Sequence, residues 1–304
     1  MIEPATRIWI LVATALVLLM TPGVAFFYSG LVKRRNVINT MQMCIICFAF
    51  IPLLWFVCGY SVAFSAHNAF FGGFDFSFLK NISWASGDAL SKEDSFGFFV
   101  FQMAFAILTP ALISGAVVGR MRFKAFVIFI VLWSLLIYCP LAHMVWGPDG
   151  FIASTLGAVD FAGGMVVHIS AGVSALVAAL ILGRRDIHTE DCKTPHNIPH
   201  VMLGAALLWF GWFGFNAGSS LAADQFADIA FINTILAPAA TLFCWTVLSW
   251  FRHRTISGVG TCVAIIVGLV CITPAAGYVT PLSAVFIGLL GGLICYVASL
   301  YEEK

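Results

Sequence analysis

The sequence has very little charge. Only 10% of its 304 residues are charged, whereas 61% are hydrophobic, and the mean hydropathy is +1.00. A composition this apolar excludes a soluble globular domain and is typical of a protein that crosses a membrane several times. The formal net charge is only +1, and its few basic residues lie in short loops, so we expect no nucleic-acid partner.

The long apolar runs also lack the side chains of a membrane enzyme. They contain neither a pair of acidic residues nor a cluster of metal ligands. Eight of the nine cysteines lie within these runs, where cysteine behaves as a small apolar residue, and Cys192 in a loop is expected to be a free thiol. We therefore expect no enzymatic activity, no catalytic residue, no metal site and no cofactor.

What the sequence does contain is a series of uncharged apolar runs, each long enough to cross about 30 Å of hydrocarbon. Helices are expected, because a helix satisfies its own backbone hydrogen bonds within lipid. The sequence therefore predicts an all-α polytopic membrane protein with nine spans, near residues 8–32, 37–66, 96–118, 125–146, 161–183, 201–223, 229–251, 255–280 and 281–301.

The loops predict how the chain is oriented. Basic residues gather in alternate loops, at 33–35, 120–124, 184–193 and 252–254. The other loops hold only Lys80 and Lys92 as basic residues, beside most of the acidic ones. The positive-inside rule places the cationic loops in the cytoplasm, so the N-terminus is expected outside and the C-terminus of this chain inside.

Two similar segments, five spans apart, indicate an internal repeat. Residues 108–112 (LTPAL) and 272–276 (ITPAA) each place a proline in an apolar run, and residues 26–30 and 213–218 form a weaker pair. An odd offset gives the two halves opposite topology, as in many transporters. We therefore expect one membrane domain over residues 1–304, with a first repeat at about 1–185 and an incomplete second repeat at about 199–304.

One histidine and one acid stand out at the fifth run. His168 lies near the start of that run, and an imidazole in hydrocarbon is costly enough to suggest a function, such as relaying a proton. The alternative is a hydrogen-bonded structural histidine. Asp160 precedes Gly163 and Gly164, where a carboxylate caps exposed backbone N–H groups; direct binding of a cation is the alternative.

Five segments together bring a family into view. They are residues 21–28 (TPGVAFFY), 142–147 (AHMVWG), 160–168 (DFAGGMVVH), 209–219 (WFGWFGFNAGS) and 272–277 (ITPAAG). In these residues the chain resembles the ammonium transporter family, the Amt branch of the Amt/Rh superfamily. The resemblance implies homotrimers whose protomers conduct separately, eleven spans, and a second pore histidine on the tenth span. This sequence has nine apolar spans, so we expect it to be a fragment or a transport-incompetent truncated homologue.

The resemblance also implies an outer site for the cation. Trp146 corresponds to its aromatic face, Phe105 to a second ring at the upper gate, and Ser219 to its hydroxyl acceptor. This fits ammonium, which has four donors and no acceptor and is attracted to a tryptophan face by about 0.5–2 kcal/mol. Without the resemblance, Trp146 would be interpreted as one of the tryptophans common at membrane interfaces.

The remaining site residues follow in the same way. The resemblance implies that Phe105 and Phe215 form a gate, that His168 lines the pore, and that Asp160 supports the site structurally. His143 is expected to be structural and bonded to a loop. Phe105 and Phe215 would otherwise be packing or lipid-facing residues among 29 phenylalanines.

The sequence thus predicts transport of ammonium or ammonia, with methylammonium as an analogue, in the plasma or inner membrane. A sensor of ammonium is the alternative, because some members of the family are joined to signalling domains. The resemblance further implies a possible P-II signalling protein as a partner at the cytoplasmic loops.

Overall fold

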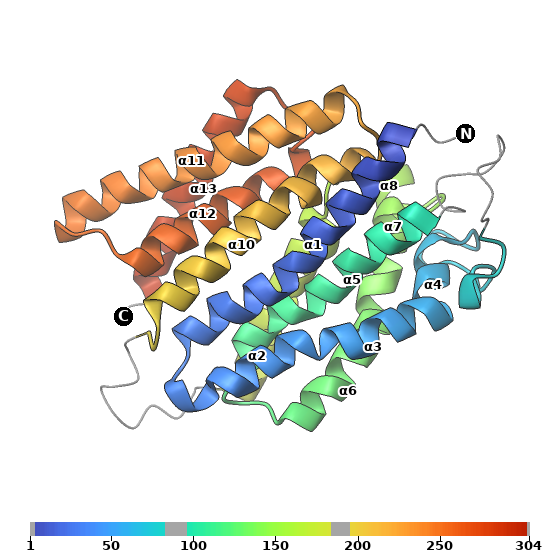
Figure 1. Cartoon of the computed structure of the whole chain (residues 1–304), viewed down its shortest axis with the longest axis horizontal. Helices are drawn as coiled ribbons and strands as arrows, with labels where there is room; N and C mark the ends of the chain where they lie inside the picture. The colour runs from blue at the N-terminus through green and yellow to red at the C-terminus, as the bar shows by residue number, and fades with distance from the viewer. Residues whose placement is uncertain (1–3, 83–95, 184–194, 303–304) are drawn as a thin grey trace.

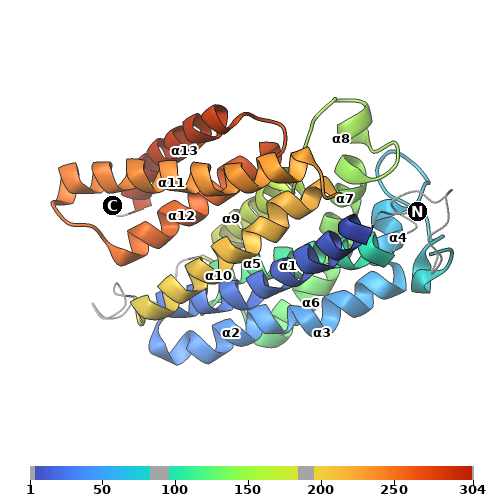
Figure 2. The ribbon, with the colours of Figure 1, turned by 45° about the horizontal axis from the view of Figure 1, so that its top comes forward.

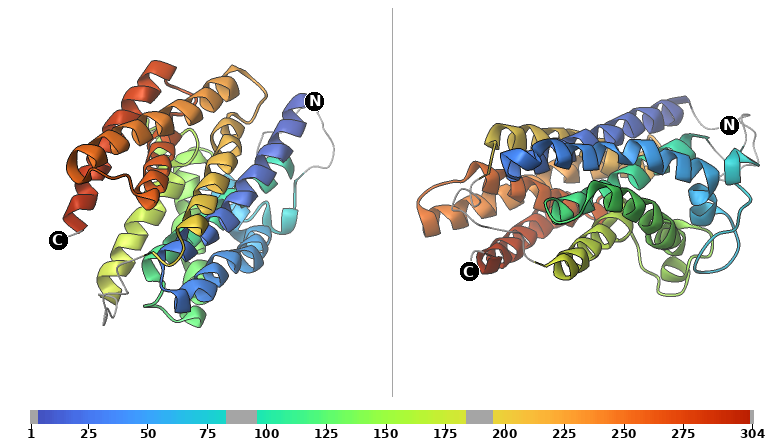
Figure 3. Two further views of the ribbon diagram at one scale, coloured as in Figure 1. Left: turned by 60° about the vertical axis from the view of Figure 1, so that its left-hand side comes forward. Right: turned by 90° about the horizontal axis from the view of Figure 1, so that it is seen from below.

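The computed structural model describes residues 4–82, 96–183 and 195–302, and these residues contain helices and turns but no strand. Within them, nine helices are long and apolar enough to cross a membrane. This confirms the predicted all-α polytopic fold. Figures 1 and 3 show an elongated bundle in which α1 (Pro4–Leu31) begins at one end and α13 (Pro281–Glu302) ends at the other.

Several spans are single helices. These are α1, α5 (Phe96–Val117), α10 (Ile198–Ala217), α11 (Gln225–His253) and α13. α10 is extended by the 3₁₀ turn η8 (Gly218–Ser220), and span eight consists of α12 (Gly258–Ile272) and the 3₁₀ turn η9 (Thr273–Ala275).

Other spans are broken into shorter pieces. Span two contains η1 (Arg34–Asn36), α2 (Val37–Ile45), α3 (Cys47–Leu54), the π-helical turn η2 (Trp55–Gly59) and α4 (Tyr60–Phe64). Span four contains α6 (Phe123–Trp133), the π-helical turn η5 (Ser134–Tyr138) and α7 (Cys139–Trp146), and it is followed by α8 (Phe151–Ser154). Span five begins with the π-helical segment η6 (Gly164–Ile169) and continues as α9 (Ser170–Leu182).

Glycines let α1 and α10 pack backbone to backbone, and these helices lie side by side in Figures 1 and 2. A Cβ atom on Gly204 would lie 2.2 Å from the Phe27 nitrogen, and one on Gly214 would lie 2.6 Å from the Ala13 oxygen. A glycine also lets α13 pack closely against α11, because a Cβ atom on Gly288 would lie 2.3 Å from the Ala237 backbone oxygen. In lipid, such close approach replaces the hydrophobic driving force between helices.

The end of span eight supports the start of span five. Pro110 lies inside α5, whereas Pro274 lies in the turn η9. The Phe161 nitrogen donates a hydrogen bond of 2.9 Å to the Pro274 oxygen, and a Cβ atom on Gly164 would lie 2.5 Å from the Pro274 ring. The glycine at 164 thus lets the two segments touch.

Among the described residues, the cysteines form no disulfide. The eight cysteines within the described residues are free thiols that lie in helices, and Cys192 falls outside the described residues. No group of three metal-ligating side chains occurs within the described part of the chain.

The glycine packing can be tested by a matched pair of substitutions. Gly204→Ala should lower the free energy of unfolding by about 1–3 kcal/mol, because the Phe27 backbone cannot yield to the added methyl group. Gly172→Ala in α9 should have no such cost, because nothing lies within 4 Å of its Cβ position. Unfolding by sodium dodecyl sulfate in mixed micelles measures both; equal stability of the two variants would contradict the packing argument.

Candidate functional site

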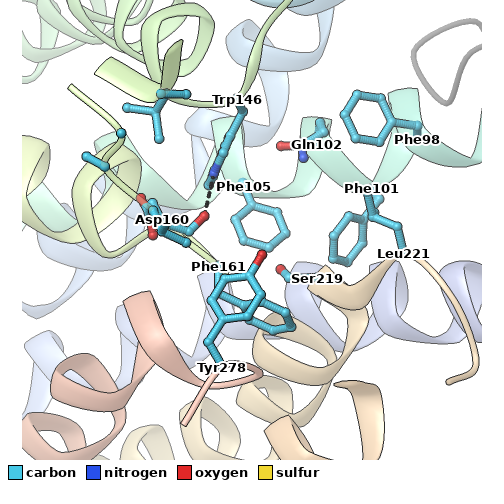
Figure 4. Close-up of a pocket in the computed structure, with 15 residues that line it drawn as sticks. Phe98, Phe101, Gln102, Phe105, Trp146, Asp160, Phe161, Ser219, Leu221 and Tyr278 are labelled. Carbon is cyan, nitrogen blue, oxygen red and sulfur yellow. Dashed lines mark hydrogen bonds between the residues drawn. The ribbon is translucent and has the colours of Figure 1, made fainter. Parts of the chain in front are cut away.

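A cavity of about 400 Å³ opens at the end of the bundle where α7 ends and α11 begins, here called the outer end. Six of its fifteen lining residues are aromatic, and they come from separate parts of the chain, as Figure 4 shows. Its lining includes Phe101, Gln102, Phe105, Trp146, Asp160, Phe161, Ser219 and Tyr278. The structure therefore brings together Phe105, Trp146 and Ser219, the residues expected to recruit the cation.

Trp146 is held in place by a backbone group. It is the last residue of α7, and its indole Nε1 donates a hydrogen bond of 2.9 Å to the Asp160 oxygen. The Phe105 ring stands at 88° to the indole, with 6.2 Å between the ring centroids. The two rings thus present differently oriented π faces at the same cavity.

Ser219 supplies a hydroxyl oxygen to this cavity. It lies in η8, directly after the aromatic string of α10, and its hydroxyl donates a 2.7 Å hydrogen bond to the Phe215 oxygen. Since its proton is used in that bond, the Ser219 oxygen keeps its lone pairs for accepting. The side chain faces the aromatic rings in Figure 4.

Phe105, which lines the cavity, packs against the buried ring of Phe215. The Phe105 and Phe215 ring centroids are 4.4 Å apart, and the residues are 1% and 0% exposed. Phe101 packs edge-on against Phe105 at 4.9 Å. The structure thus places the two phenylalanines that were expected to form a gate in direct ring contact.

His168 lies directly behind this pair. Its ring is stacked on Phe215, with centroids 5.5 Å apart and an angle of 18°, and on Trp212 at 5.4 Å and 29°. The Nε2 atom is buried and has no hydrogen-bond partner among the described residues. Trp146, Phe105, Phe215 and His168 therefore form a continuous row of rings, here called the aromatic column.

The position of His168 depends on a π-helical segment capped by Asp160. Both carboxylate oxygens of Asp160 accept backbone N–H groups at 2.6–3.2 Å, from Gly163, Gly164, Met165 and Val166. Gly163 has a φ of +109°, which glycine adopts without strain. Burial raises the pKa of the Asp160 carboxyl above its usual range, and the four N–H groups oppose that rise. This geometry fits a supporting role better than direct contact with a cation.

His143 is buried away from the aromatic column. Its Nδ1 lies 3.1 Å from the Ala63 oxygen and its Nε2 lies 2.7 Å from the Asn68 oxygen. The histidine therefore joins α7 to α4 and to the loop that follows α4. These contacts match the structural role expected from the sequence.

Sequence reasoning missed several residues of the site. Trp212 lies within the aromatic string 209–219, but only its stacking on His168 shows that it lies beside the aromatic column. Its indole Nε1 donates a 3.0 Å hydrogen bond to Thr273 Oγ1. Gln102 lines the cavity, and its buried Oε1 has no partner among the described residues. A polar side chain inside an apolar span was the available signal. Tyr278, after η9, gave no comparable signal.

Comparisons with known proteins agree on one family. The model of the Ammonium Transporter Family matches residues 8–304. An ammonium transporter of Bacillus subtilis is 47% identical, over 92% of this chain and 69% of that protein. The crystal structure of Saccharomyces cerevisiae Mep2 has a TM-score of 0.90 and 38% identity, covering 98% of this chain and 67% of that one. A sensor Amt protein of known structure has a TM-score of 0.90 and 30% identity, covering 99% and 75%. The chain thus spans about two thirds to three quarters of these relatives.

The supporting role of Asp160 can be tested against a second helix cap. Asp160→Ala should lower the free energy of unfolding by about 3 kcal/mol or more, because it leaves buried N–H donors unpaired. Asp224→Ala removes a partly exposed cap from α11 and should cost only about 1 kcal/mol. Unfolding in mixed micelles measures both. An Asp160→Ala protein as stable as the Asp224→Ala protein would show that the four bonds contribute little.

Proposed function

The chain belongs to the ammonium transporter family, and from this premise we propose that it transports ammonium or ammonia across the membrane through the aromatic column. The observation that carries the proposal is the continuity of that column. Rings 4.4–6.2 Å apart connect an outer cavity with a hydroxyl acceptor to a histidine whose Nε2 atom is buried. An apolar passage that leads to one proton-handling group suits ammonium. Ammonium is a cation in water, and it becomes neutral ammonia when it loses one proton.

Recruitment takes place in the outer cavity. Ammonium donates four hydrogen bonds and accepts none, so it needs acceptors and π faces. The Ser219 oxygen offers lone pairs, and Trp146 and Phe105 offer ring faces. A potassium ion gains the same attraction to the rings but cannot donate a hydrogen bond to Ser219. The hydroxyl is therefore the group that favours ammonium over other monovalent cations.

The gate separates this cavity from the interior. Phe105 and Phe215 must move apart for the solute to pass, and hydrated ions are excluded because the closed rings leave them no polar groups. Behind the gate, the unpartnered Nε2 of His168 supplies a polar atom that can accept or donate a proton. Stacking on Trp212 and Phe215 fixes the plane of the imidazole and thus the direction of that atom.

Several wider features belong to the same proposal. The N-terminus lies outside, spans one to five and six onward form inverted repeats, and the protomers assemble as a homotrimer. The close packing of α1 on α10, the first helix of each repeat, supports the repeat. A P-II signalling protein is the proposed partner of the loops at the cationic end.

A sensor of ammonium is the second candidate function. The similarity to a sensor Amt protein favours it, because both functions use the same outer cavity. Reconstituted vesicles distinguish the two. A transporter accumulates labelled methylammonium inside the vesicles, whereas a pure sensor binds it without carrying it across.

Replacing Trp146 tests recruitment. Trp146→Leu should weaken methylammonium binding by about fivefold to thirtyfold, because leucine keeps bulk but loses the π face. Trp146→Phe should weaken it by only about twofold to threefold. Equilibrium dialysis of labelled methylammonium with the purified protein gives both affinities. Equal affinities of the two variants would show that a cation–π interaction with Trp146 does not contribute to binding.

Replacing Phe215 tests the gate. Phe215→Ala should admit water and potassium, because it removes one of the two rings that close the cavity. Phe213→Ala is the matched control, because Phe213 lies on the same helix but stacks on Phe231 away from the aromatic column. Potassium flux into vesicles should increase only for Phe215→Ala. If that variant stays folded and still excludes potassium, these rings are not the gate.

A further inference from the structure

The indole of Trp212 is held by a buried threonine of span eight. Its Nε1 donates a 3.0 Å hydrogen bond to the Thr273 hydroxyl oxygen, and this pair joins α10 to the turn η9. The two side chains are 3% and 0% exposed. Because water has little access to either group, the bond is stronger than the same contact at a surface.

A second bond fixes the direction of the Thr273 hydroxyl. It donates its own proton to the Leu269 oxygen at 2.7 Å, four residues earlier in the same span. A threonine hydroxyl has one proton and two lone pairs. Since the proton goes to Leu269, the hydroxyl acts as an acceptor toward the indole, and the bond to its own helix holds its rotamer.

The turn that carries Thr273 is itself held from two sides. The Pro274 oxygen accepts the Phe161 N–H at 2.9 Å. From the other side, the buried amide of Asn233 in α11 donates to two backbone oxygens that follow η9, at 2.8 and 2.9 Å. These three bonds fix the turn, so that Thr273 presents its oxygen to α10 from a firm support.

The bond to Thr273 bears on what His168 meets. The indole of Trp212 and the imidazole are stacked, with centroids 5.4 Å apart, and Phe215 stacks on the same imidazole. Of these two neighbours, only Trp212 carries a polar hydrogen. An N–H that is donated to Thr273 is withheld from the imidazole. The buried Nε2 of His168 indeed has no hydrogen-bond partner among the described residues.

We propose that Thr273 is a positioning residue for the aromatic column. By accepting the indole N–H of Trp212, it keeps this donor away from the Nε2 of His168 and leaves that atom available to the solute. The proposal rests on the proposed role of His168 in transport, and it adds the group that keeps His168 available.

Removing the hydroxyl should redirect the indole. A buried N–H without an acceptor is costly, so Trp212 is expected to turn toward another acceptor. The ring stacked against it offers one, because a nitrogen of the neutral imidazole accepts a hydrogen bond. The Nε2 of His168 would then be occupied by the protein itself.

Solid-state NMR of protein with ¹⁵N-labelled tryptophan and histidine tests this arrangement. In the unaltered protein, the Trp212 indole proton should show a through-space contact with the Thr273 side chain and none with the His168 Nε2. Thr273→Val keeps the shape of threonine but removes the acceptor, so it should shift both the indole and the imidazole resonances. Thr273→Ser keeps the acceptor and should leave both unchanged. A contact between the indole proton and Nε2 in the unaltered protein, or an unchanged imidazole in Thr273→Val, would overturn the proposal.

Two further variants separate positioning from packing. Thr241→Val removes another fully buried hydroxyl, which contacts the Gly288 oxygen of α13 at 2.8 Å, and should leave the His168 resonances unchanged. Trp212→Phe removes the donor, so adding Thr273→Val to that protein should not move His168 further. An equal shift in Thr241→Val, or an undiminished effect of Thr273→Val beside Trp212→Phe, would show that Thr273 does not act through the indole N–H.

Transport into vesicles tests the consequence. Thr273→Val should slow methylammonium uptake by about twofold to tenfold, because one hydrogen bond from the indole then competes for Nε2. Its affinity for methylammonium by equilibrium dialysis should stay within about twofold, since the outer cavity is unaltered. Thr273→Ser should restore the rate. A lower affinity with an unchanged rate would contradict a role at His168. If the unaltered protein carries no methylammonium but shows the expected NMR contacts, the proposed transport is wrong and the positioning of Trp212 stands.

Discussion

The buried cap formed by Asp160 is the contact on which the rest of the site depends. Its carboxylate accepts four backbone N–H groups at the start of span five, and its backbone oxygen holds the indole of Trp146. The next residue, Phe161, is bonded to the turn at Pro274. One short segment therefore fixes the wall of the outer cavity, the direction of the span that carries His168, and the contact with span eight.

The membrane explains why the aromatic column contains few polar atoms. A charged group at bilayer depth is costly, so the interior offers a solute few polar atoms. Several of those near the aromatic column are committed: the Trp212 nitrogen to Thr273, the Ser219 proton to Phe215, and the Asp160 carboxylate to backbone. Among the four side chains of the column, His168 has a buried nitrogen, Nε2, with no hydrogen-bond partner among the described residues, and at the adjoining cavity the Oε1 of Gln102 has none either.

The described charged side chains lie toward the two ends of the bundle, and the prevailing sign of the charge differs between the ends. The described carboxylates lie toward the outer end, where Asp160 and Asp224 cap helices beside or near the cavity. Most exposed cations gather at the other end, Arg34 and Arg122 among them. Among the side chains that the structure describes, carboxylates and most exposed cations thus lie toward opposite ends of the bundle, in the alternation that the positive-inside rule expects of a membrane protein.

The sequence by itself determined the membrane class, the spans and most candidate site residues. Span length and hydropathy are local properties, so apolar runs predict helices directly. The motif that contains Trp146 and the string that contains Phe215 likewise pointed to their residues before any contact was known. Tertiary structure alone decided how they meet. The stacking of His168 on Trp212 and the inclusion of Gln102 and Tyr278 in the cavity depend on contacts between distant spans. Periodicity within one helix carries no information about which ring from another helix will lie against it.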